Sequence, residues 1–245
     1  MKKFNATQIK YLMAALMVLD HLPHIPGLIS PWWQAILHAI TRCVAAWFAY
    51  TAVEGFIHTS NLKKYVTRLW GWAAFMAVGN FLLNWLFEYR EISLSNNIFL
   101  TLAVGVSILA LLGKVTGQWS YLAKFLAILL FGLGLVLTEG GFVLLPFMLI
   151  TYYLREKLVW RNLAYLLLSL ALLVTSFQDY GNWDLTLRML LFNGEFFFIT
   201  VLPFLYLYNG ERGPKTAFNK YFFYVFYPLH LWVIAIVAYL LAGNR

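Results

Sequence analysis

The sequence predicts an all-α, polytopic integral membrane protein with about nine transmembrane helices, eight being the alternative count, and a cytoplasmic N-terminus. Hydrophobic residues make up 62% of the 245 residues, and charged residues only 11%, whereas an ordinary soluble domain carries about 25% charged residues. The apolar residues also fall into long runs that are separated by short basic segments. With so little polar surface to coat a water-soluble globule, lipid is the expected outer solvent.

The apolar runs place nine expected spans, because a helix needs roughly 20 apolar residues to cross the hydrocarbon of a bilayer. These spans are Thr7–Ile25, Trp32–Ile57, Tyr65–Phe87, Ile98–Leu112, Tyr121–Leu137, Gly140–Leu154, Leu163–Phe177, Leu185–Tyr206 and Tyr221–Leu241. Several middle runs would cover only about 22 Å at 1.5 Å per residue, and one re-entrant pair would give eight spans. No soluble domain, long linker or repeat is evident, so residues 1–245 are expected to form a single transmembrane domain.

Basic residues predict the orientation. With nine spans and a cytoplasmic N-terminus, 14 of the 18 lysines and arginines fall on the inner side, and three fall on the outer side, namely Arg90, Arg188 and Arg245. The remaining one, Arg42, lies inside a span. The positive-inside rule therefore favours this topology in the cell (plasma or inner) membrane. The same scattering in small groups argues against nucleic acid as the partner of the net charge of +8.

The first apolar run and the single cysteine exclude two other classes. Met1–Leu19 has the basic start of a signal peptide but lacks a small-residue cleavage site, and Asp20 and His21 follow directly. We therefore interpret it as a retained first span. Cys43 is the only cysteine, so no disulfide framework exists.

Several ionisable residues lie at membrane depth, where they are costly and indicate function by default. Counted along their helices, Arg42, Glu195 and His230 share the middle of the bilayer, and Asp20 and His21 lie slightly nearer the outer surface. Such groups must face each other or water. Structural interpretations stay open for them: an ion pair of Arg42 with Glu195 or Asp20, a buried structural His21, and a His230 that fills the backbone gap left by Pro228.

The spacing of Lys10 and His21 is the most informative pattern. They are 11 residues apart, about three helical turns, so they share one helix face roughly 16 Å apart, with Ala14 and Met17 between them. A cation at the cytoplasmic rim and an imidazole at depth suit a long thin donor with phosphates at one end, and acyl-coenzyme A has that shape. Imidazole is the side chain best suited to take a proton near neutral pH.

Two other function classes fit the same composition. A small transporter or channel also places charges in mid-membrane, and a noncatalytic membrane scaffold would use them as packing contacts. Neither class needs the Lys10–His21 spacing. The scattered Asp, Glu and His residues form no convincing metal-ligand set, and His24 and His38, near the outer surface, are expected to be solvated.

Five further segments are distinctive: "LDH" (Leu19–His21), "VEGFIHTSNLKKYVTRL" (Val53–Leu69), "NNIFLTLAVG" (Asn96–Gly105), "YNGERG" (Tyr208–Gly213) and "FYPLHL" (Phe226–Leu231). In these segments, in the expected order and over nearly the whole chain, the sequence resembles the TraX family, within the membrane acyltransferase superfamily that includes acyltransferase family 3. That superfamily has a basic residue, ten intervening residues and then a catalytic histidine, which Lys10 and His21 match. Arg42 matches an expected basic residue, but the following "CVAAWFAY" (Cys43–Tyr50) lacks the expected Pro-Leu-Phe.

The resemblance implies an enzyme that transfers an acyl group, acetyl being the expected one, from an acyl-CoA donor without a metal. TraX in conjugative systems is associated with acetylation of the N-terminus of pilin, and relatives acylate hydroxyls of sugars, glycans and lipids. The acceptor is therefore expected to be an amine or hydroxyl of a protein, glycan or lipid, on a side of the membrane that the sequence leaves open.

On this resemblance the candidate residues take named roles. His21 is the expected general base, with an acyl-histidine intermediate as the second choice. Asp20 assists electrostatically or pairs with Arg42, and Arg42 or His230 stabilises the oxyanion. The donor phosphates are expected to bind four cations: Lys10, Lys64, Arg68 and Arg212.

Overall fold

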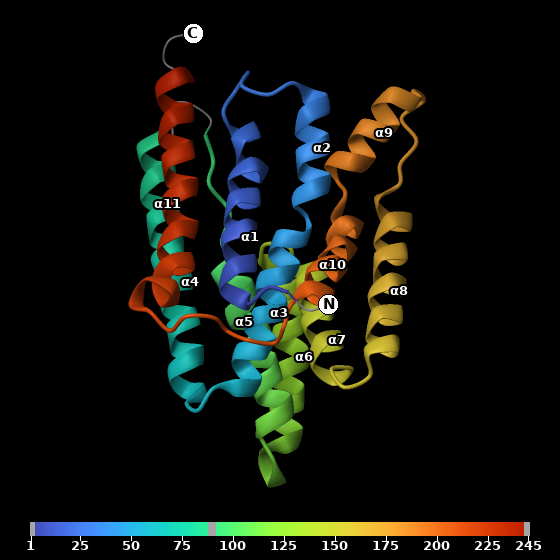
Figure 1. Ribbon diagram of the computed structural model, residues 1–245. Helices are drawn as coiled ribbons and strands as arrows, with labels where there is room; N and C mark the ends of the chain where they lie inside the picture. The colour runs from blue at the N-terminus through green and yellow to red at the C-terminus, as the bar shows by residue number, and fades with distance from the viewer. Residues whose placement is uncertain (1–2, 88–91, 243–245) are drawn as a thin grey trace. The chain divides into compact units, whose positions relative to one another are not determined.

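The computed structural model describes residues 3–87 and 92–242, in which helices are joined by short irregular segments (Figure 1). The α-helices are α1 (Ala6–His21), α2 (Pro31–Thr41), α3 (Cys43–His58), α4 (Leu62–Phe87), α5 (Ile98–Lys114), α6 (Ser120–Leu137), α7 (Gly141–Tyr153), α8 (Leu158–Ser176), α9 (Trp183–Phe192), α10 (Leu202–Leu207) and α11 (Ala217–Ala242). Short 3-10 helices are η1 (Leu22–His24), η3 (Gly117–Trp119) and η4 (Glu195–Val201). The predicted all-α class is confirmed: the described residues contain no strand, only one isolated bridge between Phe4 and Tyr208.

The expected count of about nine spans is not supported. In the described part of the chain, five segments are long and apolar enough to cross a membrane, and a bent pair raises the count to six. The five are Pro31–His58, Leu62–Phe87, Gly117–Leu137, Leu158–Ser176 and Ala217–Leu241. The bent pair is Trp183–Phe192 with Glu195–Leu207, which meet at 56°.

Three expected spans form helices that are too short to count. Helices α1, α5 and α7 have 16, 17 and 13 residues, which give about 20–26 Å at 1.5 Å per residue, against roughly 30 Å of hydrocarbon. The eight-span alternative is not supported for the same reason. Because the charge count assumed nine alternating spans, the cytoplasmic N-terminus stays a prediction, and Arg90 and Arg245 lie outside the described residues.

The chain forms two compact units, and neither is one continuous stretch. The first comprises Met1–Trp47, Asn80–Leu94 and Leu166–Arg245, and the second comprises Phe48–Gly79 and Ser95–Tyr165. The first unit therefore holds all the ionisable residues expected in mid-membrane, and also Lys10 and Arg212. Lys64 and Arg68 belong to the second unit.

Helices α1 and α11 of the first unit run parallel and side by side (Figure 1). Near their N-terminal ends, the Tyr11 ring lies 4.8 Å from the Phe222 ring, and the Tyr11 hydroxyl donates to Asn219 Oδ1. At the C-terminal end of α1, His21 contacts His230, which lies midway along α11. Both helices therefore begin at the same end of the unit.

The segment before α11 is pinned against the start of α1. The Asn209 N–H donates to the Phe4 carbonyl (2.9 Å), the Ala6 N–H donates to the Glu211 carbonyl (2.8 Å), and the Thr7 hydroxyl donates to the Arg212 carbonyl (2.9 Å). Gly213 has φ 87°, a left-handed conformation that favours glycine. This arrangement fixes the Tyr208–Gly213 segment at the foot of α1.

In the second unit, α5, α6 and α7 pack closely on one another. A Cβ atom on Gly141 would lie 2.2 Å from the Gly134 carbonyl oxygen, so the start of α7 needs a glycine to approach α6. Val104, Ile108 and Leu145 form part of the buried core between these helices. Much of this unit's apolar character is therefore used for internal packing.

Candidate active site

Three helix interruptions meet at the polar centre of the first unit. Arg42 separates α2 from α3, Glu195 begins η4 directly after the break that follows α9, and α1 ends at His21. The second break needs glycine, because a Cβ atom on Gly194 would lie 2.8 Å from the Leu191 carbonyl oxygen. Helix ends leave backbone groups without intrahelical partners, and at membrane depth the protein itself must satisfy them.

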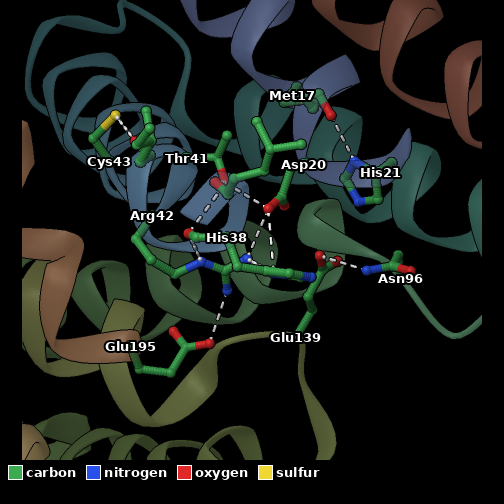
Figure 2. Close-up of polar contacts among 12 residues, drawn as sticks. Met17, Asp20, His21, His38, Thr41, Arg42, Cys43, Asn96, Glu139 and Glu195 are labelled. Carbon is green, nitrogen blue, oxygen red and sulfur yellow. Dashed lines mark hydrogen bonds and ion pairs between the residues drawn. The ribbon is translucent and has the colours of Figure 1, made fainter. Parts of the chain in front are cut away.

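The Arg42 guanidinium joins these interruptions (Figure 2). Its Nη2 atom lies 2.9 Å from Asp20 Oδ1, and its Nη1 atom lies 2.9 Å from Glu195 Oε1. Its Nε–H donates to the His38 carbonyl at 3.0 Å, which closes the C-terminal end of α2 with a cation. The sequence left open a pairing with Glu195 or with Asp20, and the structure contains both.

Asp20, near the end of α1, is held by side chains of α2. The Thr41 hydroxyl donates to Asp20 Oδ1 at 2.5 Å, and His38 Nδ1 lies 3.5 Å from the same oxygen. The carboxylate thus accepts from Arg42 and Thr41 together, and His38 Nδ1 accepts from Arg42 Nη2 at 3.0 Å (Figure 2). The expected pairing of Asp20 with Arg42 is therefore present.

His21 and His230 form a buried pair. His21 Nδ1 lies 2.8 Å from the Met17 carbonyl, and His230 Nδ1 lies 2.9 Å from the Phe226 carbonyl. Because a carbonyl only accepts, each neutral ring carries its proton on Nδ1. His230 Nε2 then accepts a second, longer bond from His21 Nδ1–H, at 3.3 Å. The Nε2 atom of His21 keeps its lone pair, and no described residue donates to it.

The structural explanation of His230 through Pro228 is wrong. A proline at position 228 removes the donor for the carbonyl of Tyr224, four residues earlier. His230 bonds to the Phe226 carbonyl instead. His230 is 7% exposed, and its ring contacts the ring of His21.

Two histidines that were expected to be solvated contact the site. His24 is exposed, but its ring centroid lies 5.3 Å from that of His21. His38 is half-buried and contacts both Arg42 and Asp20, so the expectation that it is solvated is wrong. Two spacings in the sequence could have indicated these contacts: His24 follows His21 by three residues, and His38 precedes Arg42 by four residues. Thr41 was missed because hydroxyls carry no charge signal.

Lys10 and Arg212 bring two cations to the foot of α1. Lys10 lies on the same unbroken helix as His21, outside the candidate spans, and Arg212 is placed nearby by the pinned segment. The pKa of the Lys10 ammonium is lowered by burial first and then by the charge of Arg212. Neither residue makes an ion pair with any described residue. Ala14 and Met17, between Lys10 and His21, are buried, so a ligand that follows this face must displace packed side chains.

The other two predicted donor-binding cations lie in the second unit. The Lys64 N–H donates to Asn61 Oδ1 at the start of α4, and the side chain is exposed. The Arg68 guanidinium lies 5.4 Å from the centroid of the Tyr65 ring, one turn further along. Their convergence with Lys10 and Arg212 stays a prediction. Within the described residues, no group of three or more His, Cys, Asp or Glu is arranged to hold a metal ion.

Comparison with known proteins yields one family and one curated relative. The sequence model of a family described as "TraX protein" matches residues 5–238. A Dichelobacter nodosus protein described as "Probable fimbrial assembly protein FimC, serogroup H1" is 25% identical over 240 residues, which cover 93% of each chain. No solved structure matches.

Proposed function

The chain belongs to the TraX family, and from this premise we propose that it is a membrane-embedded acyltransferase that uses acyl-CoA, acetyl-CoA in the first instance. We also place it, on the Lys10–His21 spacing, within the acyltransferase family 3-like superfamily. The observation that carries the proposal is the buried His21, whose tautomer is fixed by the Met17 carbonyl so that Nε2 presents a lone pair. A neutral imidazole of this kind is suited to general-base catalysis.

In the proposed reaction His21 Nε2 accepts the proton of the acceptor amine or hydroxyl. The freed nitrogen or oxygen attacks the thioester carbonyl carbon, and the C–S bond breaks as the tetrahedral intermediate collapses. The departing sulfur takes the proton from the His21 imidazolium. The products are an acylated amine or hydroxyl and free coenzyme A, and His21 returns to its starting state.

The surrounding residues take roles that follow from their contacts. His230 accepts from His21 Nδ1–H and so orients the ring, but its own N–H is committed to the Phe226 carbonyl. Arg42 has five N–H groups, and one on Nη1 is left over after Asp20, Glu195 and His38 are satisfied. Arg42 is thus the better oxyanion donor of the two, while Asp20 positions it.

The donor-binding residues are proposed from their charge, and the acceptor is proposed from the name of the relative. Lys10 and Arg212 would bind the phosphates of the donor, with Lys64 and Arg68 as further candidates. The relative is described as a fimbrial assembly protein. We therefore propose a component of a surface filament, modified at its N-terminal amine, as the first acceptor to test, and an envelope glycan as the second.

Thiol release from acetyl-CoA by the purified protein in detergent tests the proposal. His21→Ala should slow hydrolysis or transfer at least about 100-fold, in the range of a lost general base, with an unchanged thermal midpoint. His24→Ala is the matched control, because His24 touches the same ring but is exposed. If His21→Ala releases thiol as fast as the unmodified protein, the proposal fails.

One observation favours transport as a second candidate. Broken helices that meet at charged residues are typical of substrate and ion sites in transporters, and here the breaks at Arg42 and Glu195 meet. The charges are already paired with one another, which favours a structural junction. Protein that neither binds nor cleaves acetyl-CoA, but carries out Arg42-dependent uptake in proteoliposomes, would select the transporter.

A further inference from the structure

Arg161, in the second unit, is a buried cation without an acidic partner. The residue is only 8% exposed, and its Nε atom is buried with no hydrogen-bond partner. Its Nη2 atom makes one long bond, 3.4 Å, to Asn162 Oδ1, and its guanidinium carbon lies 5.8 Å from the centroid of the Tyr165 ring. No described carboxylate pairs with it. A buried charge is costly unless it is paired and hydrogen-bonded.

Two acidic residues of the same unit, Glu54 and Glu156, are paired elsewhere. Glu54 Oε1 lies 4.0 Å from Arg155 Nε, and Glu156 Oε1 lies 3.6 Å from the same atom. Glu54 also lies 3.8 Å from His58 Nδ1. Two carboxylates therefore surround Arg155, and Arg161 has neither of them.

The position of Arg161 on α8 adds a second attraction for an anion. It lies in the first turn of a 19-residue helix whose first turn contains no acidic residue. The first N–H groups of a helix have no intrahelical acceptor and carry partial positive charge. Phosphate groups bind readily at such a terminus, and Lys157 directly precedes it.

We propose that Arg161 binds the phosphate of an anionic phospholipid headgroup at the start of α8. The choice of lipid follows from the neighbouring side chains: Leu158, Val159 and Trp160 are 55%, 79% and 62% exposed. The candidate span Leu158–Ser176 begins at this turn, which places it at the boundary of hydrocarbon and headgroups. Tryptophan is enriched at that boundary, and guanidinium matches phosphate in a bidentate geometry. This site is independent of the proposed transfer reaction.

The test is lipid binding by the delipidated protein in detergent, followed by native mass spectrometry with added phosphatidylglycerol. Arg161→Gln should weaken binding about tenfold, because a charge-assisted hydrogen bond is lost. Without lipid, its thermal midpoint should equal or exceed that of the unmodified protein, since a buried unpaired charge has been removed. Arg155→Gln, which removes a cation six residues away, should leave the affinity unchanged.

The same experiment is repeated with inorganic phosphate and with coenzyme A as soluble competing ligands. Arg161-dependent binding of phosphatidylglycerol, with neither soluble probe competing, supports the lipid assignment. Arg161-dependent binding of coenzyme A or phosphate in its place overturns it. Two further results would also overturn it: an affinity unchanged in Arg161→Gln, or a midpoint that falls without lipid, which would make Arg161 structural.

Discussion

The Nε2 atom of His230 lies 3.3 Å from the Nδ1 atom of His21, and backbone carbonyls of α11 and α1 fix the Nδ1 proton of each ring. The pair therefore has a direction: His230 accepts, His21 donates, and the free lone pair is on His21 Nε2. By accepting from Nδ1–H, His230 holds the His21 ring in the orientation that presents Nε2.

His230→Ala should lower kcat for thiol release about tenfold, a smaller loss than that expected for removing the base itself. The KM for acetyl-CoA should not change, because His230 contacts the base, which lies at the opposite end of α1 from Lys10. Steady-state rates over a range of acetyl-CoA concentrations separate the two constants. His230→Gln is the informative companion, since its amide oxygen can accept where Nε2 did; a Gln variant as slow as Ala would contradict the orienting role.

The Arg42 junction should behave as a coupled unit in unfolding. Arg42→Gln leaves the Asp20 and Glu195 carboxylates without a cation, and we expect a loss of about 2–4 kcal/mol. The double variant Arg42→Gln/Asp20→Asn should lose less stability than the sum of the two single losses, and the difference, the coupling energy, should be about 1–3 kcal/mol. Equilibrium unfolding in mixed detergent micelles measures the cycle. Strictly additive losses would show that the pair contributes no mutual stabilisation.

Lys10 and Arg212 should affect donor binding and leave the chemical step intact. Lys10→Gln and Arg212→Gln should each raise the KM for acetyl-CoA about fivefold with little change in kcat, because each removes one phosphate contact. Lys10→Arg should retain the original KM. Lys124→Gln, at an exposed position of α6, is the matched control. A KM that does not respond to either change would place the donor elsewhere.

The sequence placed its charged residues by counting their depth along the predicted spans. It left open a pairing of Arg42 with Glu195 or with Asp20, and the structure contains both, each at 2.9 Å. Depth does not give the direction in which a side chain points around its helix. For that reason the contact between His21 and His230, 209 positions apart, was not predicted, and neither was the contact of His38 with Asp20.

The expected span count is not supported, because an apolar run has two possible causes. In α5, Phe99, Ala103 and Leu109 are completely buried, so the helix is apolar because protein surrounds it. Hydropathy cannot distinguish this from lipid exposure, and only the length of the run hints at it. Breaks such as the one at Gly194 depend on close backbone contacts, which the sequence does not display.

Gly141 and Gly132 allow a matched test of helix packing in the second unit. A Cβ atom on Gly141 would lie 2.2 Å from the Gly134 carbonyl oxygen, whereas one on Gly132 would meet nothing within 4 Å. Gly141→Ala should therefore destabilise the protein by about 1–3 kcal/mol, and Gly132→Ala should be neutral or stabilise it by up to about 1 kcal/mol. Thermal unfolding in detergent compares them. Equal midpoints for the two variants would mean that α6 and α7 are not in contact there.

The direction of α1 can be tested by labelling its two ends. Glu211 lies in the segment pinned to the start of α1, and Leu28 follows its other end and is 54% exposed. In a Cys43→Ser background, Glu211→Cys and Leu28→Cys should react with an impermeant maleimide from opposite sides of sealed vesicles. The predicted cytoplasmic N-terminus requires that Glu211→Cys reacts only in inside-out vesicles. If both cysteines react from one side, then α1, with its 16 residues, enters the membrane without crossing it, and His21 is reached from the side that holds Lys10.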